Sequence, residues 1–260
     1  MIKEQNRSGR EYMKVRKVNQ KEFWEIRVKQ YNELQWANEK NYLNAIVKAG
    51  DFKPNHLVLD VGTGTGIVLH AIAPKVNEII GLDISQAMLE HSNWQDNKYF
   101  VKRDIREPFF HDSLFDRVVA RMVFHHIIED TQKASNECYR ILKPGGKFIL
   151  SEGIPPSKEV WEDYIKIFKL KEERITFMLE DLAETIKKAG FKNIQTSTFI
   201  MPRMSINNWL EKSGLPEKTQ DKIFEMHICA PDYFKKAYNM KIIRGDCLID
   251  IKYVILIGEK

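Results

Sequence analysis

The sequence predicts an α/β fold in which helices cover both faces of a doubly wound, mostly parallel sheet. Short apolar runs alternate with segments of helical periodicity between residues 56 and 152, as βαβ units require. The first run leads directly into a glycine-rich loop, which marks the ligand-binding edge of open α/β sheets. The 260 residues are 43% hydrophobic and 30% charged, a globular composition that excludes a disordered or collagen-like chain.

Each element is predicted from its own local pattern. Apolar positions at helical spacing predict two N-terminal helices between residues 22 and 48. Short apolar runs predict five buried strands, at residues 56–61, 78–83, 98–102, 115–121 and 147–152. Helical patterns between these runs predict helices at residues 67–73, 85–92 and 131–142. Residues 143–146 predict a tight turn into the fifth strand.

The last third of the chain has a less regular pattern. Amphipathic periodicity predicts helices at residues 158–170 and 179–189, and apolar runs predict strands at 193–199 and 248–257. About fifty residues separate these two strands, which is too many for a hairpin loop. We therefore expect a single domain with a largely helical insertion late in the sheet.

Charge and cysteine content exclude several classes of protein. Residues 1–20 hold six basic and two acidic side chains, so this tail carries +4 of the net charge of +5. Residues 21–260 therefore lack the basic excess of a typical nucleic-acid binder, and we expect the tail to be mobile. The three scattered cysteines form neither a disulfide framework nor a zinc motif. No apolar run suits a membrane span or a signal peptide, so we expect a cytoplasmic location.

The glycine loop at residues 62–66 places glycine at every second position after the first predicted strand. Glycine there permits positive φ angles and close approach of a ligand. A dinucleotide fingerprint would require glycine at position 67, where Ile67 stands, and the Gly-Lys-Ser/Thr of a phosphate-binding loop is absent. The loop therefore suits a nucleoside ligand without phosphates.

Acidic residues end the neighbouring strands. Asp83 is expected to accept hydrogen bonds from both hydroxyls of a ribose; its alternative role is an N-terminal helix cap, which Ser85 could fill instead. Asp104 could receive the amino group of an adenine, with Ile105 packing on the ring; the alternative is a solvated loop aspartate. Asp60 could orient the glycine loop, meet a cationic group of the ligand, or simply form a strand-end turn.

Four motifs in order now support a family resemblance: residues 60–66 (DVGTGTG), residues 81–85 (GLDIS), Asp104, and residues 139–146 (YRILKPGG). Over roughly residues 40–200 the chain resembles the class I S-adenosylmethionine-dependent methyltransferases. The set is most similar to the small-molecule branch that includes the ubiquinone/menaquinone biosynthesis methyltransferases. The resemblance implies a Rossmann-like sheet of seven strands, whose last strand is antiparallel and lies between the fifth and the sixth.

The resemblance also implies where the cofactor S-adenosylmethionine lies and where its product, S-adenosylhomocysteine, forms. The glycine loop would face the methionine part, the second-strand acid the ribose, and the third-strand acid the adenine. These roles fall on Gly62, Gly64, Gly66, Asp83 and Asp104. Further cofactor contacts are expected at Tyr31, Asp60, Thr63, Ile84, Ile105, Arg121 and Met122.

The tip of the fourth predicted strand is the expected reaction site. Arg121 and Met122 would lie nearest the cofactor, and His125 and His126 would follow in the pocket. Histidine is a plausible general base because its ordinary pKa of about 6.5 lies near working pH. The alternative is that one histidine caps a helix or packs in the core. No metal is expected, because two adjacent histidines lack a third ligand at helical spacing.

The expected function is methyl transfer to a small-molecule acceptor by in-line displacement. Residues 56–152 would form the cofactor-binding half of a domain spanning 21–260, with the insertion at 200–247 as a lid over an aromatic substrate pocket. The alternatives are an RNA or other nucleic-acid methyltransferase and a non-catalytic S-adenosylmethionine-binding module. The fourth strand lacks the Asn-Pro-Pro-aromatic motif of amino-methylating nucleic-acid enzymes, and Ile67 argues against a nicotinamide-dependent oxidoreductase.

Overall fold

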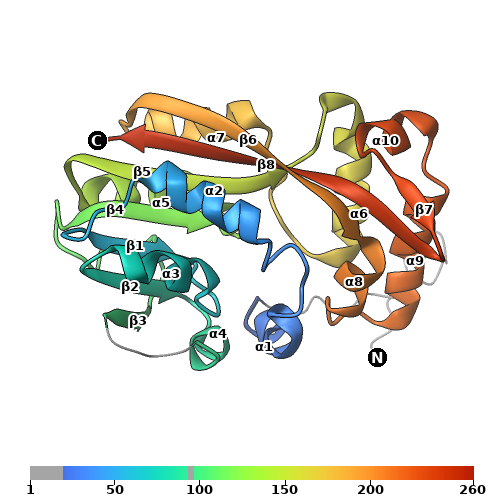
Figure 1. Ribbon diagram of the computed structural model, residues 1–260, viewed down its shortest axis with the longest axis horizontal. Helices are drawn as coiled ribbons and strands as arrows, with labels where there is room; N and C mark the ends of the chain where they lie inside the picture. The colour runs from blue at the N-terminus through green and yellow to red at the C-terminus, as the bar shows by residue number, and fades with distance from the viewer. Residues whose placement is uncertain (1–19, 93–96) are drawn as a thin grey trace, which may run out of the picture.

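The sheet has the predicted mixed, mostly parallel character. The computed structural model describes residues 20–92 and 97–260, so the basic tail, except for Gln20, lies outside the described residues. The strand order is β3-β2-β1-β4-β5-β8-β6, and β7 pairs with β8 (Figure 1). The strands are β1 Leu57–Val61, β2 Glu78–Asp83, β3 Lys98–Lys102, β4 Phe115–Arg121, β5 Leu142–Ile154, β6 Lys192–Ser205, β7 Lys241–Ile243 and β8 Asp246–Glu259.

Strand direction follows the expected plan, with one addition. Strands β1 to β5 pair in parallel, and β8 inserts antiparallel between β5 and β6. Residues 20–92 and 97–260 form eight strands where seven were expected, because the short β7 forms a hairpin with β8. Arg244 and Gly245 form its turn, and both have the positive φ angles that a two-residue type I′ turn requires. Strand β7 is only three residues long, so its apolar pattern could not be distinguished from that of the helical insertion before it.

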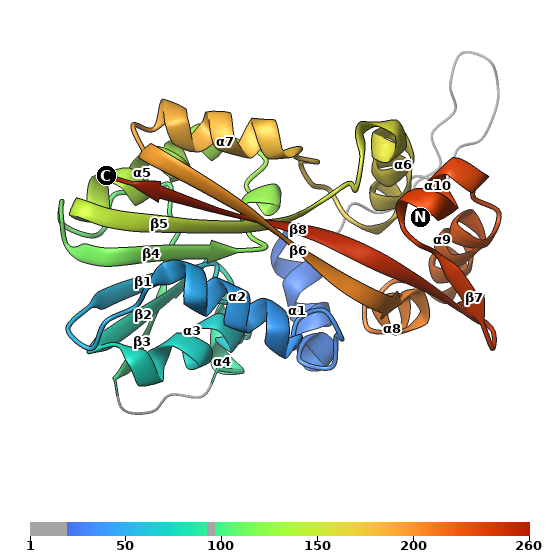
Figure 2. The same cartoon turned by 45° about the horizontal axis from the view of Figure 1, so that its top comes forward.

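Helices cover both faces of the sheet, as expected. In Figure 2, α2 and α3 lie on one face and α5 and α7 lie on the other. The helices are α1 Gln20–Tyr31, α2 Lys40–Gly50, α3 Ile67–Ile72, α4 Gln86–Glu90, α5 Thr131–Ile141, α6 Trp161–Lys171, α7 Leu179–Lys188, α8 Ile206–Glu211, α9 Glu217–Ile228 and α10 Asp232–Ala237. Short 3₁₀ turns are found at η1 Ala73–Lys75 after α3, at η2 Phe124–His126 before α5 and at η3 Lys158–Val160 before α6.

The late insertion extends the molecule beyond the sheet. Helices α8, α9 and α10 and strand β7 follow β6 and precede β8, so the insertion is largely helical. Together with α6 they gather around the far end of the long strands β6 and β8 (Figures 1 and 2). Among residues 20–92 and 97–260, no helix has both the length and the apolar character needed to cross a bilayer.

The expected turn at residues 143–146 is instead an irregular start of β5. Phe115 pairs with Leu142, but the next pair is Arg117 with Lys147, so the intervening residues bulge out of register. Gly145 has a φ of +75°, which glycine adopts without strain. The motif therefore sets the register of β5 against β4, which fixes where the β4 tip ends.

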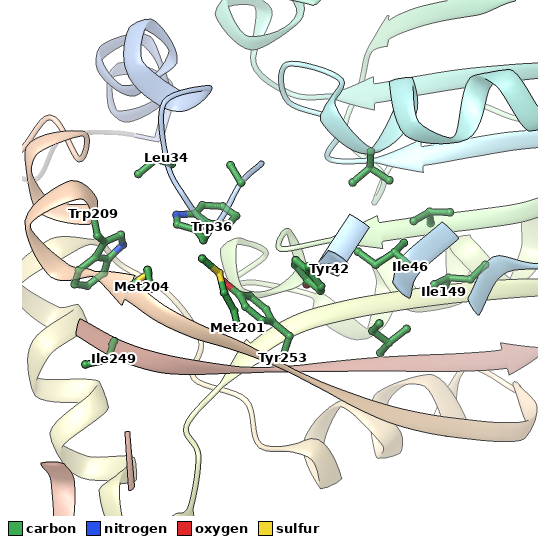
Figure 3. Packing of buried hydrophobic residues seen from close by; sticks show 14 of the residues in the cluster. Leu34, Trp36, Tyr42, Ile46, Ile149, Met201, Met204, Trp209, Ile249 and Tyr253 are labelled. Carbon is green, nitrogen blue, oxygen red and sulfur yellow. The ribbon is translucent and has the colours of Figure 1, made fainter. Parts of the chain in front are cut away.

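Tyr42 anchors α2 under the centre of the sheet. Its ring stacks between Phe199 of β6 and Tyr253 of β8, with centroids 5.4 and 4.2 Å away. Its hydroxyl lies 2.7 Å from the Ser151 hydroxyl of β5. Figure 3 shows Tyr42 and Tyr253 in the cluster that continues through Trp36 toward Trp209. This core connects the cofactor-side sheet with the insertion.

Replacing Phe148 by alanine tests the opposite core, between the sheet and helices α5 and α7. Phe148 is fully buried, and its ring packs against Phe124 and Phe191. We expect Phe148→Ala to lower the free energy of unfolding by about 3–5 kcal/mol, because it leaves a cavity. The control is Ile200→Ala, since Ile200 is 49% exposed on β6. Similar urea midpoints for the two variants would contradict this assignment of the core.

Candidate active site

A cavity of about 740 Å³ lies at the carboxyl ends of β1, β2, β3 and β4. This strand-tip cavity is bounded by the glycine loop on one side and by α1 on the other. Nine of the expected cofactor residues line it: Tyr31, Gly62, Gly64, Asp83, Ile84, Asp104, Ile105, Arg121 and Met122. The topology therefore brings together residues that are as much as 91 positions apart in the sequence.

The glycines of the loop have different steric roles. Gly62 has a φ of +64°, and a Cβ there would lie 2.3 Å from Val123 Cγ2. Gly64 has a φ of +57°, and a Cβ there would meet no atom within 4 Å. Gly62 is therefore required by the packing of the fold, whereas Gly64 keeps open space at the cavity wall.

Three expected cofactor residues do not line the strand-tip cavity. The Thr63 hydroxyl donates to Asp60 Oδ2 at 2.7 Å. This hydrogen bond stabilises the glycine loop, although neither side chain lines the cavity. Burial raises the pKa of Asp60 to about 7. Gly66 is the N-cap of α3. The loop-orienting role considered for Asp60 fits this geometry, and direct cofactor contact by the three residues stays a prediction.

Asp83 connects the glycine loop to the end of β2. Its Oδ2 accepts from the Gly64 amide at 2.9 Å, and its Oδ1 accepts from the Ser85 amide at 2.8 Å. Ser85 caps α4 by accepting from the Met88 amide, so the capping role falls to Ser85. Burial raises the pKa of Asp83. Because a carboxylate has about four acceptor positions, Asp83 keeps further lone pairs for a ligand.

Asp104 is held by a neighbour that the sequence interpretation missed. Arg106 Nη2 donates to Asp104 Oδ2 at 2.6 Å, and Arg106 Nε donates to both carboxylate oxygens. Burial opposes the charge, but the hydrogen bonds from Arg106 lower the pKa of Asp104 below its ordinary value. An adenine amino group would share this carboxylate with Arg106, which also lines the cavity.

Arg121 ends β4 and lines the strand-tip cavity. Its Nη2 donates to the carbonyl oxygens of Trp36 and Ala37 at 2.9 and 3.1 Å. Its Cζ lies 5.3 and 4.9 Å from the ring centroids of Trp36 and Tyr42. Carbonyl and aromatic contacts therefore fix the guanidinium at the tip of β4.

Met122 follows at the tip of β4 in a strained conformation. Its φ is +56°, which is unfavourable for a residue with a side chain, and its sulfur accepts from the Gly153 amide at 3.1 Å. Residues held in such conformations are often found at functional sites. Met122 lines the strand-tip cavity and also a second one.

The second cavity, of about 840 Å³, adjoins the first. The two share Trp24, Tyr31, Met122 and His126 as a common wall. The lining of this aromatic cavity comes from α1, the tip of β4, α6, the insertion and strands β5, β6 and β8. It includes Tyr164, Phe168, Met204, Trp209, Phe234, Tyr238 and Tyr253. The insertion therefore walls a compartment directly beside the strand-tip cavity.

His125 and His126 lie in η2 and both line the aromatic cavity. His125 Nδ1 lies 2.6 Å from Glu152 Oε2, and Glu152 Oε1 accepts from the Phe124 amide at 2.7 Å. Burial lowers the pKa of both histidines well below the ordinary value and raises that of Glu152 to about 7. A neutral His125 that donates from Nδ1 to Glu152 has Nε2 free as an acceptor. Sequence reasoning missed Glu152, although its place at the tip of the fifth strand was a signal.

The two histidines also have an acidic neighbour, which the sequence interpretation did not find. Ligand atoms of His125, His126 and Glu172 lie within 4.8 Å of one another. Arg27 and Arg174 donate to the Glu172 carboxylate at 3.0 and 3.3 Å. Burial opposes ionisation, but the surrounding positive charges hold the pKa of Glu172 well below its ordinary value. The carboxylate is thus engaged by basic side chains, and we assign no metal to this group.

A pH titration tests the protonation state of the histidine pair. Because burial lowers the pKa of His125 and His126, we expect both imidazoles to stay neutral from about pH 8 down to about pH 6. The measurement is NMR of labelled histidine, with His125→Gln and His126→Gln spectra for assignment. A midpoint at or above about 6.5 for either ring would contradict the neutral pair.

Comparison with known proteins agrees with this geometry. Residues 59–150 match the family described as "Methyltransferase domain". The Bacillus subtilis methyltransferase YcgJ is 24% identical over 204 residues, which cover 74% of this chain and 79% of YcgJ. Phosphoethanolamine N-methyltransferase 2 of Caenorhabditis elegans is 30% identical over 68% of this chain, but the match spans only 41% of that longer protein. Demethylmenaquinone methyltransferase of Thermotoga maritima is 34% identical over 44% of this chain and 51% of its own length.

Solved structures show the same fold. The crystal structure of B. subtilis YcgJ aligns with a TM-score of 0.76 at 23% identity and covers 85% of this chain and 98% of YcgJ. Haemonchus contortus phosphoethanolamine N-methyltransferase 2, solved with phosphomonomethylethanolamine and S-adenosylhomocysteine, aligns with a TM-score of 0.62 at 21% identity, over 94% of this chain and 59% of that one. Residues 59–150 thus match a methyltransferase domain, and the chain is similar in sequence and in fold to S-adenosylmethionine-dependent methyltransferases.

Proposed function

We propose that this S-adenosylmethionine-dependent methyltransferase methylates a small molecule bound in the aromatic cavity. The shared wall of the two cavities is the observation that carries the proposal, because it places a compartment for a second reactant beside the glycine loop. The relatives support a small acceptor, since two of them are named for phosphoethanolamine and demethylmenaquinone. The same names favour it over a nucleic-acid acceptor.

The residues of the strand-tip cavity fit the cofactor. The open space at Gly64 gives the cofactor room, and the carboxylate of Asp83 offers acceptors for the ribose hydroxyls. Asp104 and Ile105 would face the adenine. When bound, S-adenosylmethionine supplies a methyl group activated by the positive charge of its sulfur.

The chain's own contribution is mainly to align the acceptor. Rigid positioning of two reactants can be worth about 7–11 kcal/mol, and the packed walls of both cavities provide it. Where the acceptor atom begins protonated, His125 would take the proton at Nε2, with Glu152 fixing the tautomer through Nδ1. Glu152 is a positioning residue in this scheme.

The insertion and the surroundings of the enzyme complete the proposal. Trp209, Phe234 and Tyr238 line the aromatic cavity, so we expect the segment 200–247 to serve as the acceptor's lid. We expect the enzyme to work in the reducing cytoplasm, which suits its three unpaired cysteines. Two of them, Cys138 and Cys247, are buried.

Calorimetry on the full chain tests the function. We expect S-adenosylmethionine and S-adenosylhomocysteine to bind and NAD not to bind. Incubation with methyl-labelled cofactor and a small-molecule cell extract should then yield a labelled product that mass spectrometry identifies. Failure of both sulfur nucleosides to bind would contradict the proposal, and binding without any labelled product would favour a non-catalytic module.

A further inference from the structure

A buried basic cluster, made of Arg27, Lys171 and Arg174, surrounds Glu172 in the wall of the aromatic cavity. Its side chains are only 3–4% exposed. Arg27 comes from α1, Lys171 is the last residue of α6, and Glu172 and Arg174 lie just after that helix. The Ile175 amide donates to the His125 carbonyl at 2.9 Å, which holds this segment against the histidine pair.

The cluster brings cationic groups into the wall of the aromatic cavity. Arg27, Lys171 and Arg174 each form an ion pair with the Glu172 carboxylate. A buried charge is costly unless an opposite charge lies nearby, so an anion bound in the cavity would stabilise these cations further. Burial and the neighbouring Arg27 lower the pKa of Lys171 to about 7, and an anion beside it would restore its proton.

Arg174 has the geometry to bind that anion. Its Nη1 donates to Glu172 and its Nε to the Ile175 carbonyl, while Nη2 makes no hydrogen bond within the described residues. The guanidinium lies over the Phe168 ring at 4.3 Å, and Lys171 Nζ lies 5.3 Å from the Trp209 ring. The cationic groups of Arg174 and Lys171 thus lie between the Glu172 carboxylate on one side and the aromatic rings of the cavity on the other.

We propose that the acceptor is an amphipathic anion whose carboxylate or phosphate binds this basic cluster while its apolar body fills the aromatic cavity. The inference rests on the proposed function, because it specifies the molecule that occupies the acceptor compartment. Glu172 lies beside His126, which belongs to the wall shared with the strand-tip cavity. The basic cluster around Glu172 therefore lies close to the wall that the two cavities share.

Calorimetry with four probes of one chain length tests the proposal. The full chain is first saturated with S-adenosylhomocysteine and then titrated with decanoate, decyl phosphate, 1-decanol or decylamine. We expect at least one anion to bind about tenfold or more tightly than both the alcohol and the amine. The stronger of the two anions identifies the head group. Equal affinity for the anions and decanol, or preference for decylamine, would overturn the proposal.

Variants of Arg174 identify the site. Arg174→Gln should weaken the preferred anion about tenfold and leave decanol unchanged, and Arg174→Lys should restore part of the affinity because it keeps the charge. The matched control is Lys166→Gln, which removes one charge from the exposed side of α6. An anion preference that survives Arg174→Gln in a folded protein would overturn the assignment. Should that variant not fold, the four-probe comparison on the unaltered chain decides.

The saturation step separates the two proposals. If S-adenosylhomocysteine does not bind, the proposed function fails before any probe is added. If it binds normally and the four probes show no charge preference, only the anionic acceptor is overturned.

Discussion

Asp83→Ala is expected to raise the dissociation constant for S-adenosylhomocysteine about 30- to 1000-fold. Hydrogen bonds to a charged group contribute about 1.5–3 kcal/mol each, so losing the ribose contacts costs about 2–4 kcal/mol of binding free energy. The variant also frees the amides of Gly64 and Ser85, which loosens the loop itself. Calorimetry gives the affinity, and thermal unfolding should remain cooperative because Asp83 ends its strand at the cavity rather than in the hydrophobic core.

The matched control for Asp83 is Glu90→Ala. Glu90 lies on α4, seven residues further on, and its exposed carboxylate accepts a hydrogen bond from the Gln86 side chain. Like Asp83→Ala, Glu90→Ala removes one carboxylate from this segment, but it changes no residue that lines the strand-tip cavity. Asp83→Ala with unchanged cofactor affinity, or a loss equal to that of Glu90→Ala, would refute the ribose role.

Alanine at two glycines of the loop should have different consequences. Gly62→Ala is expected to destabilise the protein by about 2–5 kcal/mol, because its Cβ meets Val123 at 2.3 Å and its φ is positive. Gly64→Ala faces no such clash and should cost only about 1–2 kcal/mol of strain. Its methyl group would stand at the cavity wall, so we expect S-adenosylhomocysteine affinity to fall about tenfold or more.

Gly145→Ala controls for the backbone strain in this comparison. Gly145 has a φ of +75° and open space around its Cβ position, but it lies in the β5 bulge away from both cavities. It should show the stability cost of Gly64→Ala and no loss of affinity. Urea denaturation and calorimetry on the three variants would contradict the account if Gly64→Ala bound the cofactor as well as Gly145→Ala.

The cofactor half could be predicted from sequence because local signals and position coincide there. A strand that ends in glycines can be read from adjacent residues, and parallel topology then brings Asp83 and Asp104 to the same edge. The resemblance supplied the antiparallel last strand, which β8 confirms. The position of His125 at the aromatic cavity followed from the same logic, since it comes just after the tip of β4.

The acceptor side could not be predicted because its contacts join segments that are distant in sequence. Arg27 and Glu172 are 145 residues apart, and neither belongs to a motif. Glu152 was visible only as the polar end of an apolar strand. Arg106 is two residues from Asp104, but nothing in the local sequence pattern predicts that its side chain donates to the Asp104 carboxylate. These side-chain pairs form only when the chain folds, so neither the composition nor the periodicity of the sequence predicts them.

A crystal structure of the full chain grown with S-adenosylhomocysteine tests the central claim most directly. The account predicts density in the strand-tip cavity, with both ribose hydroxyls within hydrogen-bonding distance of the Asp83 carboxylate and the amino-acid portion against Gly64. Density for the nucleoside outside this cavity, or a ribose turned away from Asp83, would contradict it.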